Sequence, residues 1–214
     1  MNPFPSGYRL IEIAGLADPW LPDWLRLYET TFPAEERILA GELVRLLQDP
    51  ASRRTHALLA LVEAEQGLSG LALWQSRPDL SAASLWYLAV RPELRSAGLG
   101  SAFYQSIAAS ALTHHRLLIL EVEMPAEAPD EASRRLRERR IDFYRRNGAR
   151  LLTGIDYLQS VGAHVPPAPM HLMAQGVGPA SSREVEPLTA AEVFTAGLGL
   201  FGSLLTQTGE LNLT

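Results

Sequence analysis

The segment Arg95–Ser101 (RSAGLGS) combines an arginine with two glycines, and it lies between a predicted strand ending at Val90 and a predicted helix. Glycines let a ligand approach the backbone closely, while the N–H groups and dipole at a helix start favour an anion. The arginine adds a positive charge at the rim. The segment is neither a Walker loop nor a G-x-G-x-x-G fingerprint, because residues required by each are missing. It therefore predicts a phosphate-binding turn suited to a pyrophosphate.

Two carboxylates form the second group that could do chemistry. Glu121 and Glu123 alternate on an apolar strand expected over Arg116–Met124, so both side chains point to one face near its end. Carboxylates on such a strand are costly unless they are exposed or useful. Two interpretations stay open: one glutamate acts as a general base or binds a substrate cation, or the pair faces solvent at a sheet edge.

Other chemistry is excluded by composition. The 214 residues contain no cysteine, which excludes disulfides, thiolate zinc sites and cysteine nucleophiles. All 19 basic residues are arginines, so Schiff-base chemistry on lysine is excluded as well. The histidines show no spacing typical of a metal site, and no metal is expected.

The elements that must position these residues follow from apolar periodicity and from turn signals. Two adjacent helices are expected early, the second opened by Pro33. Strands are expected at Tyr8–Ala14, Thr55–Glu65, Leu68–Ser76, Ala83–Val90, Arg116–Met124, Ala149–Gln159 and Met170–Gln175, and further helices at Gly98–Leu112, Glu131–Asn147 and from Thr189. This order predicts an α/β (α+β) protein with a mixed, mostly antiparallel central sheet flanked by helices.

We expect one main domain at residues 1–176. Residues 177–214 are expected to form a linker and a C-terminal helix that packs on the domain or on a partner subunit, so a homodimer is one possibility. Thr189 and Glu192 predict a capping box at the start of this helix. A G-x-G-x-x-G at Gly197, Gly199 and Gly202 lies inside the helix and follows no strand, so we interpret it as close helix packing.

Charge and hydropathy limit the partners and the compartment. The formal net charge is −5, which argues against a nucleic-acid partner and for a cationic or neutral one. The N-terminus has no positive region followed by an apolar one, and the longest apolar stretch is too short to span a bilayer. We expect a cytoplasmic protein with no membrane partner.

Two segments together resemble a known family. The turn Arg95-x-x-Gly98-x-Gly100 after a Leu-Ala-Val strand resembles the acetyl-CoA loop (Q/R-x-x-G-x-G/A) of the GNAT (GCN5-related) N-acetyltransferase superfamily. The segment Asp142–Ala149 (DFYRRNGA) resembles the family's Phe-Tyr-x-x-x-Gly-Phe signature. The resemblance covers residues 8–176 and implies the GNAT fold.

The sequence departs from the family pattern in the helix before that signature. Arg137 and Arg140 stand where many relatives have Asn and Ala, and Ala149 replaces an aromatic residue. The helix is rich in arginine, and we interpret this basic run as a solvated face offset by Glu131 and Glu138. Contact with the coenzyme's phosphates is the alternative.

The resemblance implies roles for individual residues. The backbone of Leu88, Ala89 and Val90 would bind the pantetheine arm of acetyl-CoA. The pyrophosphate would be held by Arg95, Ser96, Ala97, Gly98, Leu99, Gly100 and Ser101. Tyr144 matches the tyrosine that protonates the departing thiolate. The strand pattern described above, and not the resemblance, makes Glu123 or Glu121 the candidate for the catalytic base.

The acceptor site is expected between the first two helices. Tyr87 is a candidate for lining the acceptor pocket. Glu35 and Glu36 either contact a cationic substrate or favour a helix N-terminus through its dipole, and the second interpretation is preferred.

The resulting hypothesis is an N-acetyltransferase that moves an acetyl group directly from acetyl-CoA, its co-substrate, to a primary amine of a small cationic acceptor. An alternative from another class is a catalytically inactive GNAT-fold domain that binds acyl-CoA as a regulatory or interaction module. Conversion of Tyr144 to Phe separates the two hypotheses.

Overall fold

Helices and strands follow one another along the chain as the sequence predicts, with one strand added at the end. The computed structural model describes residues 4–65, 67–95, 98–160, 165–176 and 187–214. The helices are α1 (Leu21–Thr31), α2 (Ala40–Gln48), α3 (Leu99–His114), α4 (Glu131–Arg146) and α5 (Ala190–Phe201). The strands are β1 (Tyr8–Glu12), β2 (His56–Glu63), β3 (Gly67–Arg77), β4 (Ala82–Val90), β5 (Leu117–Glu123), β6 (Arg150–Gln159), β7 (Ala168–Gly176) and β8 (Leu205–Leu213). The predicted α/β class, with mostly antiparallel strands flanked by helices, is confirmed.

The contacts within the chain divide it into two units. The first unit comprises Met1–Ser76 and Leu85–Ile107, and the second comprises Arg77–Ser84 and Ala108–Thr214. In the first unit the strands follow the order β1-β2-β3-β4. In the second the order is β5-β7-β6-β8, with antiparallel pairing throughout.

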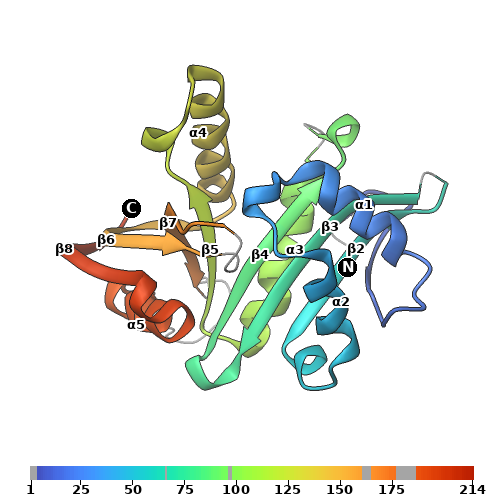
Figure 1. The fold of residues 1–214 in the computed structure, drawn as a ribbon, viewed down its shortest axis with the longest axis horizontal. Helices are drawn as coiled ribbons and strands as arrows, with labels where there is room; N and C mark the ends of the chain where they lie inside the picture. Colours follow the sequence, from blue (N-terminus) through green and yellow to red (C-terminus); the bar gives the residue numbers. More distant parts are fainter. Residues whose placement is uncertain (1–3, 66, 96–97, 161–164, 177–186) are drawn as a thin grey trace. The chain divides into compact units, whose positions relative to one another are not determined.

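Helices α1 and α2 cover one face of the first unit's strands (Figure 1). Trp24, Tyr28 and Leu43 are each at most 1% exposed and form the centre of this core. The indole Nε1 of Trp24 donates a hydrogen bond to the Leu59 carbonyl at 2.9 Å, so the buried polar atom of this side chain is satisfied. The core ties α1 to β2, one of the two strands beside β3.

The start of α2 differs from the prediction. Pro33 opens a short 3-10 turn at Ala34–Glu36, and α2 itself begins at Ala40. The reason is that two tyrosine hydroxyls form hydrogen bonds with the backbone between this turn and α2. The Tyr28 hydroxyl donates to the Ile38 carbonyl at 3.1 Å, and the Ile38 N–H donates to the Tyr87 hydroxyl at 3.0 Å. Backbone groups engaged in this way are withdrawn from helical hydrogen bonding.

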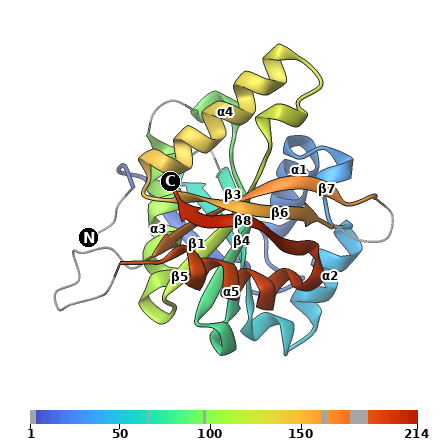
Figure 2. The ribbon, with the colours of Figure 1, turned by 90° about the vertical axis from the view of Figure 1, so that its left-hand side faces the viewer.

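Helix α5 packs on the second unit's strands, beside β8 (Figure 2). The predicted capping box at Thr189 and Glu192 is confirmed. A Cβ added to Gly197 would lie 2.7 Å from a Leu205 methyl carbon, so the helical glycine does permit close packing, as the sequence suggests. Within the described residues, no helix is long and apolar enough to cross a membrane.

The last strand, β8, was not predicted, because the C-terminal segment was expected to be helical after its linker. It pairs antiparallel with β6. The register shifts between Thr153 and Ile155, and Gly154 at this bulge has φ of +81°. A Cβ at Gly154 would collide with the Glu210 carbonyl of β8. The pairing therefore requires glycine at this position for two reasons: the positive φ angle and the close approach of the β8 backbone.

We expect Gly154→Ala to destabilise the protein by about 2 kcal/mol, because it adds both backbone strain and a steric collision. For a chain of this size the midpoint of thermal unfolding should fall by about 4–8 °C. Differential scanning calorimetry measures this. Gly209→Ala is the matched control, since its Cβ would meet only the Gly154 Cα, at an ordinary 3.7 Å. Equal effects of the two substitutions would contradict the argument.

Candidate functional site

The predicted phosphate-binding turn lies between β4 and α3. Gly98 has φ of +78°, and no atom of the described residues lies within 4 Å of where its Cβ would be. The side chain of Arg95 is exposed, and its Nε donates to the Val90 carbonyl at 3.2 Å. Leu99 is buried, which anchors the first turn of α3, where Gly100 and Ser101 follow. Ser96 and Ala97, also expected to take part, lie outside the described residues.

Gly98 directly precedes a 16-residue helix. The first N–H groups of an α-helix have no partner inside the helix and carry the positive end of its dipole. An exposed arginine adds a charge that can pair with phosphate oxygens. These features are typical of an anion-binding turn.

The strand before the turn is held by a close contact with β3. A Cβ on Gly70 would lie 2.8 Å from the Ala89 carbonyl oxygen and 3.2 Å from the Phe103 ring. The N–H of Arg91 donates to the Ser69 carbonyl at 3.0 Å. Leu88, Ala89 and Val90 thus lead into the turn along a strand whose position is fixed by its neighbour.

Tyr87 connects β4 with the segment between α1 and α2. Its hydroxyl donates to the Glu36 carbonyl at 2.9 Å and accepts from the Ile38 N–H. Its ring packs edge-on against Tyr28 and Phe32, with centroids 4.8 and 4.9 Å away. The structure therefore brings Tyr87 and the Glu36 backbone together. Glu35 is exposed in the 3-10 turn, so the expected start of an α-helix at this point was wrong.

Glu121 is bonded within the second unit. Its carboxylate accepts from the Tyr157 hydroxyl at 2.9 Å and from the Gln159 side-chain amide. Burial raises the pKa of Glu121, against the effect of these two donors. The interpretation in which the pair of glutamates simply faces solvent is wrong for this residue.

Glu123 has a different partner on α4. Its carboxylate, only 13% exposed, forms an ion pair with Arg140. One helical turn earlier, the Arg137 Nη1 donates to the Met124 carbonyl at 2.8 Å. The two arginines that depart from the family pattern thus both bind the end of β5.

Tyr144 is buried on α4, 8% exposed. Burial raises the pKa of its phenol to about 12, while the charge of Arg140 lowers it. The group is therefore protonated at neutral pH. It can act as a proton donor, as the sequence predicts for this position.

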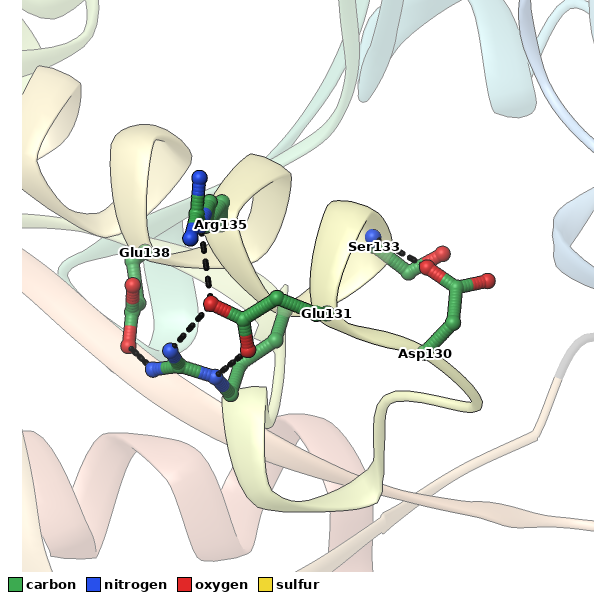
Figure 3. Close-up of polar contacts among 6 residues, drawn as sticks. Asp130, Glu131, Ser133, Arg135 and Glu138 are labelled. Atoms are coloured by element: carbon green, nitrogen blue, oxygen red, sulfur yellow. Dashed lines mark hydrogen bonds and ion pairs between the residues drawn. The ribbon is translucent and has the colours of Figure 1, made fainter.

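The opposite side of α4 carries paired charges (Figure 3). Arg134 and Arg135 both bind the Glu131 carboxylate, and Arg134 also binds Glu138. Asp130 caps the helix by accepting from the Ser133 N–H at 2.7 Å. The predicted solvated, charge-balanced face is confirmed for these arginines.

The structure brings the predicted residues together in two groups, one in each unit. In the first unit the turn follows β4, and Tyr87 of the same strand binds the Glu36 backbone. In the second unit Glu121 and Glu123 lie on β5, and Tyr144 lies on α4. Three partners were not predicted: Tyr157, Gln159 and Arg140. Tyr157 and Gln159 alternate along β6, which is the signal that both point to one face of that strand. In the described ranges there is no group of three or more His, Asp or Glu side chains that could hold a metal.

The comparisons with known proteins agree with these features. The profile of the acetyltransferase (GNAT) family matches residues 21–149. A putative GNAT acetyltransferase from Bacteroides thetaiotaomicron has a similar structure, with a TM-score of 0.66 and 21% identity, covering 91% of this chain and 98% of that one. No curated protein matches the sequence significantly.

Two structural neighbours carry more specific names. Spermidine N-acetyltransferase from Vibrio cholerae has a TM-score of 0.58 and 13% identity, covering 80% of this chain and 95% of that one. The ribosomal-protein-S18-alanine N-acetyltransferase from Escherichia coli has a TM-score of 0.54 and 18% identity, covering 84% and 99%. At these identities the likeness concerns the fold.

The raised pKa of Glu121 predicts a pH-dependent stability. A carboxyl whose pKa is higher in the folded than in the unfolded protein stabilises the fold at low pH, and this contribution is lost as pH rises through the folded pKa. Glu121→Gln cannot ionise and should therefore be more stable than the wild type at pH 7. The difference should vanish toward pH 4.

Thermal unfolding followed from pH 4 to 8 checks this prediction. The exposed Glu210→Gln is the control and should follow the wild type at every pH. A constant difference between Glu121→Gln and the wild type across this range would show that burial of the charge is not its cause.

Proposed function

The chain belongs to the GNAT acetyltransferase family, and from this premise we propose that it transfers an acetyl group from acetyl-CoA to a primary amine of a small cationic acceptor. The observation that carries the proposal is the turn after β4. It combines Gly98 in a left-handed conformation, an exposed Arg95 and the start of α3. These features fit the pyrophosphate of a coenzyme.

The remaining parts of the coenzyme site follow from the strand. The backbone of Leu88–Val90 would bind the pantetheine arm by sheet-like hydrogen bonds. The bound coenzyme supplies an acetyl group activated as a thioester. The protein's own residues then have two tasks, to take a proton from the amine and to return one to sulfur.

Glu121 is the better candidate for the first task. An alkyl ammonium has a pKa near ~10.4, so it must lose a proton before it can attack. The raised pKa of Glu121 makes it a stronger base than an ordinary carboxylate. The charge of Glu123 is balanced by its ion pair with Arg140, which makes Glu123 the weaker candidate for the base. A buried carboxylate and the net charge of −5 both favour a cationic acceptor.

Tyr144 is proposed for the second task. Its phenol is protonated at neutral pH and buried, so it can donate to a thiolate in a site that excludes water. Membership of the family implies direct transfer between the thioester and the amine, and the lack of cysteine excludes a cysteine-bound acetyl intermediate.

Coenzyme binding is tested by thermal shift, which needs no knowledge of the acceptor. Acetyl-CoA or CoA at about 100 times the Kd should stabilise the protein by ~2.7 kcal/mol, or about 5–10 °C. ATP should not. Arg95→Ala should weaken the shift, while Arg53→Ala, at another exposed arginine, should retain it. The absence of a shift at saturating coenzyme would refute the proposed site.

Turnover is tested with Tyr144→Phe and a panel of primary amines, polyamines included. We expect kcat to fall by a factor of about 100 or more, because a general acid is lost. The coenzyme thermal shift should persist. Tyr8→Phe, on the edge strand β1, is the control and should retain activity. Coenzyme binding without turnover on any amine in the wild type would instead support a regulatory acyl-CoA-binding domain.

A further inference from the structure

Arg137 and Arg140 lie one helical turn apart on α4, so they share a face of the helix. Both reach the end of β5: Arg137 donates to the Met124 carbonyl at 2.8 Å, and Arg140 pairs with the Glu123 carboxylate. The Arg140 side chain is 38% exposed and that of Glu123 is 13% exposed. The pair therefore lies at the protein boundary with its negative member buried. Loss of the arginine would leave a buried carboxylate without its partner, which costs more than breaking a freely solvated ion pair.

We propose that Arg140, held in place by Glu123, is a positioning residue for Tyr144. It fixes this face of α4 on the end of β5 and keeps a guanidinium beside the phenol, where it stabilises the phenolate left after proton donation. The inference rests on the proposed function, in which Tyr144 is the proton donor.

Helix geometry supports this assignment. Residues four apart lie on the same side of an α-helix, with side chains about one turn from each other. Tyr144 follows Arg140 by four positions and is buried on that side. The Arg140 charge acts on the Tyr144 phenol in the direction that makes it more acidic. Arg140, which pairs with Glu123, and the proposed proton donor Tyr144 thus lie on one face of α4.

The chemistry explains why a cation is needed there. In the proposed step the Tyr144 O–H bond breaks, its proton goes to the departing sulfur, and the electron pair stays on the phenolate oxygen. A thiol has a pKa near ~8.5, whereas the pKa of Tyr144 is about 12, so transfer to sulfur is uphill. A neighbouring guanidinium lowers this cost by stabilising the phenolate.

Within the described part of the chain, the other ionisable groups around α4 are bonded, exposed or neutral. On the elements packed against the helix and on the adjoining β7 they are Glu121, Glu123, Glu127, Arg150, Asp156, Tyr157 and His171. Glu121 and Tyr157 bind each other, and Arg150 binds the Leu188 carbonyl. Asp156 and Glu127 are exposed. Burial and the charge of Arg145 keep the pKa of His171 low, so it is neutral in the alkaline range in which a phenol titrates.

A direct test places 3-fluorotyrosine at position 144 and follows its ionisation by ¹⁹F NMR, over the pH range in which circular dichroism shows a folded protein. Fluorination makes the phenol more acidic and brings its titration into that range. We expect Arg140→Gln to move the titration to higher pH and Arg140→Lys to leave it close to wild type. Arg139→Gln, which removes the same charge from an exposed neighbour, should not move it. If Arg140 had only a structural role, the titrations of the glutamine and lysine variants would not differ.

Kinetics of the unfluorinated proteins complete the test. Arg140→Gln should lower kcat about tenfold, the factor that corresponds to one unit of pKa, and leave KM for acetyl-CoA unchanged. Arg140→Lys should recover most of the rate. Identical ¹⁹F titrations in wild type and Arg140→Gln, or an equal shift in Arg139→Gln, would overturn the inference. If no amine is acetylated but the titrations behave as expected, the proposed function fails while the placement of the charge stands.

Discussion

Two carboxylates at the end of β5 are removed from water when the protein folds, and this constrains where the neighbouring elements can lie. A buried carboxylate must be neutralised or bonded, because its desolvation otherwise costs several kcal/mol. Glu121 meets this requirement with two donors from β6, and Glu123 meets it with Arg140 from α4. The end of one strand thereby determines where a second strand and a helix can lie. The different partners also separate the two glutamates chemically, since one has a neutral environment and the other a cationic one.

A comparable arrangement occurs in the first unit with a phenol in place of the carboxylate. The Tyr87 hydroxyl binds two backbone groups between α1 and α2, those of Glu36 and Ile38. This segment therefore follows β4, and β4 is in turn fixed against β3 where Gly70 allows close approach. The segment between α1 and α2, which is expected to face the acceptor, is thus joined by hydrogen bonds to β4, the strand expected to bind the pantetheine arm. Tyr87 thus holds this segment in place through its hydroxyl.

The parts of the fold that depend on local pattern were predictable from the sequence. Apolar periodicity located the strands and helices, the spacing Arg95-x-x-Gly98-x-Gly100 located the turn, and the capping box located α5. Strand β8 was not predictable in this way, because most of its side chains are exposed and its existence depends on backbone pairing with β6. The late start of α2 and the pairing of Arg140 with Glu123 likewise depend on residues distant in sequence. Only tertiary contact decides between such alternatives.

Helix α4 shows why one residue type can have two roles. Seven of its sixteen residues are arginines, and only Ile141 and Tyr144 are buried. Hydrophobic contact alone holds such a helix weakly, so charge must contribute to its position. Ion pairs on its outer face involve side chains 44–66% exposed and contribute little to stability. The pair with Glu123 has a buried partner, so it has the greater effect on where the helix lies. The location of Tyr144 therefore depends on the ion pair between Arg140 of this helix and Glu123 of β5, and the charge of the same Arg140 lowers the pKa of the Tyr144 phenol.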